Sequence, residues 1–569
     1  MSNEPPSGRT IGIDLGTTHS LVAIFSDGKA EVLTNELGHS LVPSVVALGD
    51  DDALLVGAPA AEMAVRRPER AAARFKPDMG TDRVRKLGDR QMGPVALSAL
   101  ILRELKTVAE NHLQAPVTNA VITVPAWFRE PQRAATVEAA QVAGLHIDRV
   151  LNEPTAAAIA HGLHQADRES ITVVLDLGGG TFDVTILEMF EGVVEVIASV
   201  GDTQLGGEDF TDGLVEHLVE THGVDKFGSA AELRRKVELA KRALTDAESA
   251  NIITHDETIA VDRATLEAVN QKLLERIRTC ITEAMVQAGH STRQITEVLL
   301  VGGATRMPCI HALAESIFER KPLSGIDVDH VVAEGAAVQT ALLAKDEAVK
   351  DFVVTDVTPH SLGVAVVREH RGTILDDYFS PILHRGTTIP VSRSEPFSTI
   401  HHEQDSVTLK VYQGEHRKAS FNEHIGQLIV DKLPISKNVE DRCDFQVRFS
   451  HDANGLLEVE ATVDATGRKV STVIERRPGA LSEADRDKAI EAMQSLKTPP
   501  RELLPNRYAL ERANRIYSTL RPEHRYVLDD VLLQFEAALE RQDPREMEQT
   551  RSALNRALDN VAHLTELET

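Results

Sequence analysis

A glycine-rich strand–turn–strand unit occurs twice in this chain, and this repeat limits the possible folds more than any other feature. The first copy joins a predicted strand at Thr10–Leu15 to a second at Ser20–Phe25 through a Gly-Thr-Thr turn. The second copy, about 160 residues later, places predicted strands Ile171–Asp176 and Phe182–Leu187 on either side of three glycines. Apolar runs in these strands are typical of sheets buried on both faces. The repeat predicts two related α/β halves facing each other across a cleft, a favoured place for a ligand.

The turns of both copies carry residue types that bind phosphate groups. Glycine lets the backbone approach a phosphate, while amides and threonine hydroxyls donate hydrogen bonds. An aspartate at a strand end is suited to hold Mg²⁺ through water. One such turn alone would be interpreted as structural, but two copies with the same Asp, Gly and Thr pattern predict a phosphate site. The residues are Asp14, Gly16, Thr17 and Thr18 in the first copy, and Asp176, Gly178, Gly179, Gly180, Thr181 and Asp183 in the second.

A third pair of glycines follows the apolar run Val298–Val301. Gly302 and Gly303 permit close approach of the backbone to a flat or phosphorylated ligand. Arg306, three residues further on, is suited to stack on a purine ring. The three glycine-rich segments together predict a nucleotide site.

Composition excludes several classes of partner. The 569 residues are too many for one core, and the formal net charge of -26 opposes binding to nucleic acid or anionic membranes. The N-terminal residues are polar, and no stretch approaches the length of a membrane span, so a cytoplasmic protein is expected. The three cysteines, which lack metal-like spacing, are expected to be reduced thiols.

The character of the chain changes after residue 350. A short apolar segment between acidic residues indicates a linker at 351–357. Alternating strands with turn signals then predict an antiparallel sandwich over 358–475. Capping and amphipathic patterns, including the stripe Leu528, Leu532, Phe535 and Leu539, predict a small helical bundle over 476–569. With the α/β part at 1–350, four parts are expected.

Further motifs make the chain resemble one family. The glycine-rich segments resemble the nucleotide-binding domain shared by actin, sugar kinases and DnaK-type chaperones. The segments Val121–Phe128, Leu151–Ala158, Leu205–Phe210 and Asp356–Gly363 resemble the chaperone branch, the seventy-kilodalton heat-shock family. The resemblance covers nearly the whole chain. It is closest to the short HscC subgroup at Thr387–Arg393, at Ser398–Glu415 and in the abbreviated helical end.

The resemblance implies a fold and a nucleotide site. The fold would be an actin-like two-lobed ATPase of duplicated ribonuclease-H-like halves, then a linker, a β-sandwich peptide-binding domain and a truncated helical lid. Asp14, Asp176 and Asp183 would surround Mg²⁺ largely through water. Lys76 would neutralise charge on the γ-phosphate, and Glu153 and Thr181 would place the attacking water. The other implied nucleotide contacts are Gly16, Thr17, Thr18, Gly178, Gly179, Gly180, Gly206, Gly207, Glu208, Glu238, Lys241, Arg242, Thr245, Gly302, Gly303, Arg306 and Asp329. The expected cofactors are ATP or ADP and Mg²⁺, with K⁺ as a further candidate ion.

The resemblance also implies peptide-binding and coupling residues. An extended client peptide would lie against the β domain by backbone hydrogen bonds and one apolar pocket. The residues that correspond to this cleft and its arch are Leu362, Val364, Val367, Phe397, Ile400, Val407 and Leu409. The residues implied in interdomain coupling are Pro125, Arg133, Arg149, Asp351, Val353, Val354 and Asp356. Unfolded or client polypeptides, a J-domain co-chaperone and a nucleotide exchange factor are the implied partners, and a monomer is expected.

Three departures and two alternatives bear on this interpretation. His19 and Trp127 stand where the family usually has asparagine and tyrosine, and Thr355 replaces an aliphatic linker residue. One alternative is a nucleotide-gated regulatory binder of a single client with little turnover. The other is a sugar or small-molecule kinase, which would give residues 356–475 no role.

Overall fold

A computed structural model describes most of the chain. The described residues are 9–163, 169–190, 193–223, 230–254, 258–349, 352–370, 373–438, 441–452, 456–474, 501, 504–519, 522–541 and 544–566. They divide into two compact units. Unit 1 comprises Met1–Leu362 with the short segments His384–Thr387 and Gln413–His416, and unit 2 comprises the rest. The four domain boundaries predicted from the sequence stay predictions.

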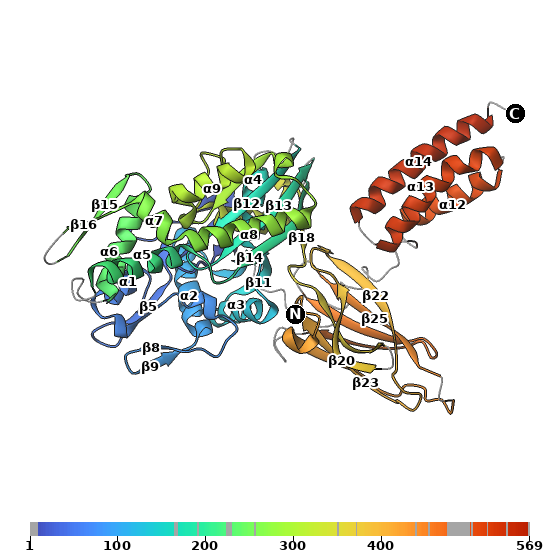
Figure 1. Cartoon of the computed structure of the whole chain (residues 1–569), viewed down its shortest axis with the longest axis horizontal. Helices are drawn as coiled ribbons and strands as arrows, with labels where there is room; N and C mark the ends of the chain where they lie inside the picture. The colour runs from blue at the N-terminus through green and yellow to red at the C-terminus, as the bar shows by residue number, and fades with distance from the viewer. Residues whose placement is uncertain are drawn as a thin grey trace. The chain divides into compact units, whose positions relative to one another are not determined.

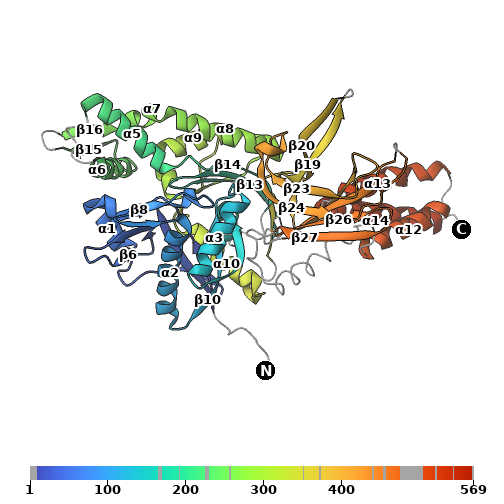
Figure 2. The same ribbon diagram turned by 90° about the horizontal axis from the view of Figure 1, so that it is seen from below.

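The first lobe of unit 1 is built on a mixed sheet with the strand order β11-β10-β1-β2-β3. Strands β1 and β10 pair in parallel, as do β10 and β11, whereas β1–β2 and β2–β3 are antiparallel. Helices α2 and α3 pack against each other beside this sheet (Figure 2). The elements are β1 (Arg9–Asp14), β2 (His19–Ser26), β3 (Lys29–Val32), β4 (Val42–Pro43), β5 (Val45–Leu48), β6 (Leu54–Val56), α1 (Ala58–Arg66), β7 (Ala71–Ala73), β8 (Arg85–Leu87), β9 (Arg90–Met92), α2 (Pro94–Leu113), β10 (Val117–Val124), α3 (Glu130–Val142), β11 (His146–Asn152) and α4 (Glu153–Leu163).

The second lobe repeats this arrangement. Its sheet has the order β17-β12-β13-β14-β18, with β12 parallel to β17 and the hairpins β12–β13 and β13–β14 antiparallel. Helix α8 runs along β13 and β14 (Figure 1). The elements are β12 (Ser170–Leu177), β13 (Phe182–Phe190), β14 (Val193–Asp202), α5 (Gly207–His222), α6 (Ala230–Ala243), β15 (Ser249–Ile253), β16 (Thr258–Asp262), α7 (Arg263–Val269), α8 (Gln271–Ala288), β17 (Glu297–Val301), α9 (Pro308–Phe318), α10 (Val331–Leu343) and β18 (Val353–Val357).

Helices α4 and α10 pack against each other at very short range between the two sheets. A Cβ atom at Gly335 in α10 would lie 1.8 Å from the carbonyl oxygen of Ala156 in α4. Likewise, a Cβ at Gly12 in β1 would lie 2.3 Å from the amide nitrogen of Ala337. Only glycine permits this approach, because any side chain would displace main-chain atoms. The predicted internal repeat thus produces two sheets whose first hairpins carry the glycine-rich turns.

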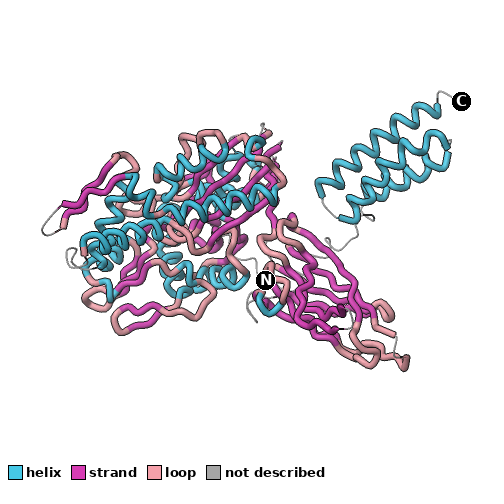
Figure 3. Tube along the Cα trace, in the orientation of Figure 1, coloured by secondary structure: helices cyan, strands magenta, loops and turns pink. Residues whose placement is uncertain are grey.

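Unit 2 contains two four-stranded sheets, ordered β20-β19-β23-β24 and β22-β25-β26-β27. Strands predominate over the residues described between 363 and 474 (Figure 3). This outcome agrees with the strand alternation in the sequence. The strands are β19 (Leu362–His370), β20 (Thr373–Leu383), β21 (Thr388–Ile389), β22 (Val391–Ser398), β23 (Val407–Gln413), β24 (Glu423–Val430), β25 (Asp444–His451), β26 (Leu457–Val463) and β27 (Arg468–Ile474).

Three helices end the described chain: α12 (Leu504–Thr519), α13 (Pro522–Arg541) and α14 (Pro544–Glu566). The predicted stripe packs between them, with Leu528, Phe535 and Leu539 buried and Leu532 partly buried. Helix α14 begins at Pro544, where the missing amide proton costs nothing. The capping pattern predicted at Ser482 lies outside the described residues. Among the described helices, none has both the length and the apolar character needed to cross a bilayer.

Candidate functional site

The two glycine-rich turns face each other, as the repeat predicted. A Cβ atom at Gly179 would lie 2.6 Å from Cγ2 of Thr18, and one at Gly180 would lie 3.3 Å from Cγ2 of Thr17. Behind the second turn, a Cβ at Gly206 would lie 2.4 Å from the carbonyl group of Gly179. The two turns and the start of α5 therefore approach each other at the backbone, with amide and hydroxyl groups close to one point.

A cleft of about 420 Å³ opens beside these turns. It brings together most of the predicted nucleotide residues: Asp14, Gly16, Thr17, Thr18, Lys76, Glu153, Asp176, Gly178, Gly179, Thr181, Gly207, Glu208, Glu238, Lys241, Arg242, Thr245, Gly302, Gly303, Arg306 and Asp329. Three other predicted residues lie outside its lining. Gly206 packs behind Gly179, Gly180 packs against Thr17, and Asp183 is buried at the start of β13.

Lys76 and Glu153 form a buried ion pair at the turn end of the cleft. Lys76 Nζ lies 2.6 Å from Glu153 Oε1, and the two side chains are 5% and 10% exposed. Lys76 belongs to a 3-10 helix after β7, whereas Glu153 begins α4. The Lys76 ammonium group also lies 5.7 Å from the centre of the Phe128 ring. A buried cation that faces the phosphate turns is suited to receive a negatively charged ligand.

Three buried aspartates gather beside this pair. Burial, followed by the charge of Glu153, raises the pKa of Asp14 to about 7 and that of Asp183 to about 8. Burial and the same carboxylate also raise the pKa of Asp176 well above its usual value. Asp176 Oδ2 and Asp183 Oδ1 are buried without a hydrogen-bond partner. Crowded carboxylates with open lone pairs favour either protonation or a cation.

The described part of the chain contains no group of three or more His, Cys, Asp or Glu side chains that could hold a metal ion directly. Because Asp176 and Asp183 each have a buried oxygen without a partner, the aspartates fit a cation that keeps its waters, as Mg²⁺ commonly does. The unpartnered oxygens of Asp176 and Asp183 would accept hydrogen bonds from such waters.

The far end of the cleft is lined by one face of α6. Lys241 Nζ donates to the carbonyl of Gly207 at 2.7 Å and pairs with Glu238 at 2.7 Å. Arg242 Nε donates to the same carboxylate at 2.8 Å. These partners lower the pKa of Glu238 against the opposing effect of burial. The three- and four-residue spacing puts these side chains on one helix face, where they form an ordered polar wall.

The third glycine pair closes the opposite wall. Gly302 has φ 83°, and a Cβ there would lie 2.5 Å from the carbonyl oxygen of Leu177. Arg306 pairs with Asp329 at 2.6 Å. The guanidinium group is half exposed, so one of its faces is available to stack on a flat ring.

Sequence reasoning missed nine residues of the lining: His19, Leu21, Leu41, Asp246, Val301, Ala304, Met307, Val328 and Val332. His19, Ala304 and Met307 adjoin predicted residues, so their neighbours gave a signal. Leu41 and Val332 gave none, because only the tertiary fold places them in the cleft.

The predicted linker forms a strand. Val353–Val357 is β18, which pairs in parallel with β14 and places Val354 opposite Val194. Asp356 is buried and accepts a hydrogen bond from Asn152 Nδ2 at 2.8 Å, and Arg133 donates to the same Asn152 side chain. Burial raises the pKa of Asp356, and Arg133 and Arg149 oppose this rise. Asn152 was not predicted. Asp351 lies outside the described residues, as does the side chain of Val353.

Pro125 precedes a contact that the sequence did not predict. Trp127 follows it by two residues and meets the ring of His360 edge-on, with centroids 4.8 Å apart. The guanidinium carbon of Arg385 lies 4.8 Å from the centre of the Trp127 ring. All three belong to unit 1. Trp127, which stands where the family usually has tyrosine, thus packs between the imidazole ring of His360 and the guanidinium group of Arg385.

The residues predicted to bind peptide differ in exposure. Leu362, Val364 and Leu409 are buried, and Phe397 stacks on Phe445 at 6.3 Å. Val407 is partly buried. Val367 and Ile400, the predicted arch, are 37% and 41% exposed. The exposed pair is available to a ligand, whereas Leu362, Val364 and Leu409 are packed inside the protein.

Two comparisons bear on the identity of this chain. The model of the family described as "Hsp70 protein" matches residues 10–86 and 83–567. The chaperone protein DnaK of Thermotoga neapolitana is 38% identical over 504 residues, which cover 84% of this chain and 82% of that protein.

Proposed function

This chain belongs to the Hsp70 family, and from that premise we propose a role for each side chain of the cleft. The protein is an ATP-dependent molecular chaperone that hydrolyses ATP and binds client polypeptides. The proposed roles rest on the geometry of the phosphate turns, of which the buried Lys76–Glu153 pair carries the most weight.

During the reaction Lys76 and Glu153 would separate, Lys76 to contact the γ-phosphate and Glu153 to contact the attacking water. In the structure the two side chains neutralise each other. When ATP enters, the γ-phosphate would attract the Lys76 ammonium group, which leaves the Glu153 carboxylate free to accept a proton from water. Thr181, whose side chain is buried at the second turn, would position that water. Phosphoryl transfer to water requires in-line positioning and charge stabilisation, and these three groups would supply both.

Asp14, Asp176 and Asp183 would hold Mg²⁺ through its waters. When bound, Mg²⁺ would supply positive charge to the polyphosphate. The raised pKa values of the three aspartates reflect burial and the charge of Glu153, which a cation would relieve. At the other end, Glu238, Lys241 and Arg242 would hold the adenosine opposite Arg306.

The β18 strand would couple nucleotide state to peptide binding. Its pairing with β14 and the Asp356–Asn152 hydrogen bond support a docked linker in one state of the cycle. Hydrolysis would release it, provided that ATP binds the two states with different affinity. Val367 and Ile400 would contact the client. A J-domain co-chaperone, an exchange factor, a cytoplasmic location and membership of the HscC subgroup belong to the same proposal.

Single-turnover ATP hydrolysis by the wild type and by Lys76→Ala, with and without an apolar heptapeptide, tests this proposal. We expect wild type to hydrolyse ATP and the peptide to accelerate it. The variant should bind ATP and lose about 100-fold or more in rate, because a charge at the transferring phosphate is removed. A wild type that binds ATP without hydrolysis would instead indicate a nucleotide-gated binder, which no observation favours.

A further inference from the structure

A second pocket, of about 280 Å³, lies behind the phosphate turns. Its lining includes Thr17, which also lines the nucleotide cleft, and Gly180, which does not. The consecutive residues Glu208 and Asp209 of α5 are divided in the same way, with Glu208 in the cleft and Asp209 in the pocket. The two cavities therefore meet at the phosphate end of the cleft.

The wall between the cavities is thin. A Cβ atom at Gly180 would lie 3.3 Å from Cγ2 of Thr17 and 3.5 Å from Cγ of Pro77. Gly180 therefore packs against Thr17 and Pro77 through its backbone, with no side chain of its own. Thr17 and Pro77 belong to the first lobe and Gly180 to the second, so a small relative movement of the lobes would open this wall.

Three arginines line the pocket: Arg74, Arg83 and Arg85. Two carboxylates face them. Asp78 pairs with Arg83 at 2.9 Å and with Arg85 at 2.5 Å, while Asp209 accepts a hydrogen bond from the Gly206 amide. Arg85 Nε is buried without a hydrogen-bond partner. Counted over the lining residues alone, three arginines exceed two aspartates by one charge, and Arg85 Nε is a spare donor, which suits a small anion.

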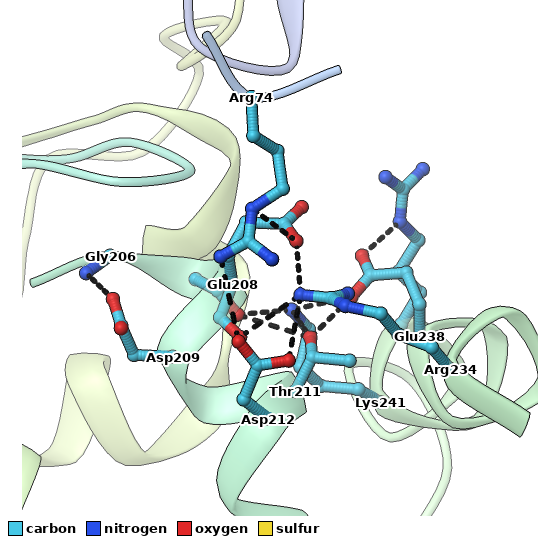
Figure 4. A network of polar contacts seen from close by, with 11 residues as sticks. Arg74, Gly206, Glu208, Asp209, Thr211, Asp212, Arg234, Glu238 and Lys241 are labelled. Carbon is cyan, nitrogen blue, oxygen red and sulfur yellow. Dashed lines mark hydrogen bonds and ion pairs between the residues drawn. The ribbon is translucent and has the colours of Figure 1, made fainter. Parts of the chain in front are cut away.

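Arg74 connects this pocket to the cleft. In Figure 4 its side chain points towards Glu208 and Asp212, whose carboxylates lie 3.4 and 3.5 Å from it. Arg234 pairs with both carboxylates as well. Arg74 thus joins the first lobe to α5 of the second, beside the thin wall.

After hydrolysis, inorganic phosphate must leave the phosphate end of the cleft. Attack by water forms a bond from its oxygen to the γ-phosphorus and breaks the bond to ADP. Under the proposed function, on which this inference rests, ADP then fills the cleft between the phosphate turns and the walls around α6 and Arg306. Inorganic phosphate is therefore enclosed on the cleft side, and the pocket lies directly across the wall. We propose that this arginine-lined pocket is the exit route for inorganic phosphate, separate from the route of ADP.

Two variants test the route by different means. Arg83→Gln combined with Arg85→Gln removes positive charge, whereas Ala73→Leu adds bulk to an exposed lining residue and keeps every charge. Arg66→Gln is the matched control, because Arg66 is exposed, pairs with Asp50 in the same lobe and does not line the pocket. Hydrolysis is followed by acid quench, phosphate release by a fluorescent phosphate-binding protein, and ADP release by chase of a fluorescent analogue.

We expect the double glutamine variant to slow phosphate release about tenfold, the effect of losing one charge-assisted hydrogen bond, and Ala73→Leu to slow it by narrowing the pocket. Hydrolysis and ADP release should match the control. Unchanged phosphate release in both variants would overturn the route, as would equal slowing of phosphate and ADP release. If wild type fails to hydrolyse ATP in the quench assay, the ATPase assignment fails first and the exit route with it.

Discussion

Acid should weaken the contact between His360 and Trp127. His360 is 3% exposed, and burial lowers its pKa from 6.5 to about 4, with Arg129, Arg385 and Arg133 adding to the effect and the Trp127 carbonyl opposing it. A histidine with a lowered pKa favours the folded state in its neutral form. That stabilisation is complete above pH 6.5 and is lost as the pH falls from 6.5 towards about 4.

The size of the effect follows from the two pKa values. At about pH 5.5 an exposed histidine is roughly tenfold more often protonated than neutral, whereas the buried His360 is still neutral. The free energy that favours burial of the His360 ring is therefore smaller by about 1.4 kcal/mol. At about pH 7.5 the same calculation gives almost no effect. The contact should therefore weaken roughly tenfold between these two conditions.

Trp127 is the only tryptophan in the chain, so its fluorescence reports this contact directly. We expect wild type to show an acid transition that His360→Leu lacks, because leucine fills the space without titrating. The variant keeps Arg385 over the indole ring, which makes it a control for general acid effects. The same transition in both proteins, or none in wild type, would refute the reasoning.

Two further substitutions test the cleft and the coupling strand. Gly206→Ala should weaken ATP binding and cost about 1–3 kcal/mol of stability, because the new Cβ meets backbone atoms 2.4 Å away. Gly93→Ala is the control, because its Cβ would meet nothing within 4 Å. Calorimetric titration with ATP and thermal unfolding measure both effects, and equal behaviour of the two variants would contradict the prediction. Asn152→Ala should reduce peptide stimulation of the ATPase, because Asp356 loses a buried hydrogen bond worth about 1–3 kcal/mol. ATP binding is measured as the control, and undiminished stimulation would exclude a coupling role for Asn152.

Local patterns were sufficient for the phosphate turns, whereas the nucleotide role of the α6 residues was implied only by the resemblance. Gly178 and Thr181 belong to one turn, in which the Gly178 amide donates to the Thr181 carbonyl, and Glu238 and Lys241 share a face through helical spacing alone. The predicted strand at Thr10–Leu15 differs from β1 by one residue at each end, the usual uncertainty at element termini.

Long-range contacts could not be predicted in the same way. Asn152 and Asp356 are 204 residues apart, and no local property of either indicates the other. The same holds for Leu41 and Val332, which line the cleft only because separate elements converge there. The resemblance named Asp183 and Gly180 as nucleotide residues, but only the structure shows that they stand behind the lining rather than in it.

By itself, the sequence determined the repeated turns, because these depend on short spacings along one chain, and its resemblance to one family implied most of the other cleft residues. The tertiary structure alone decided that Lys76 meets Glu153, that β18 joins β14, and that arginines gather behind the phosphate turns. Each of these depends on where separate elements pack, and packing is set by the shape of the whole core rather than by any one segment.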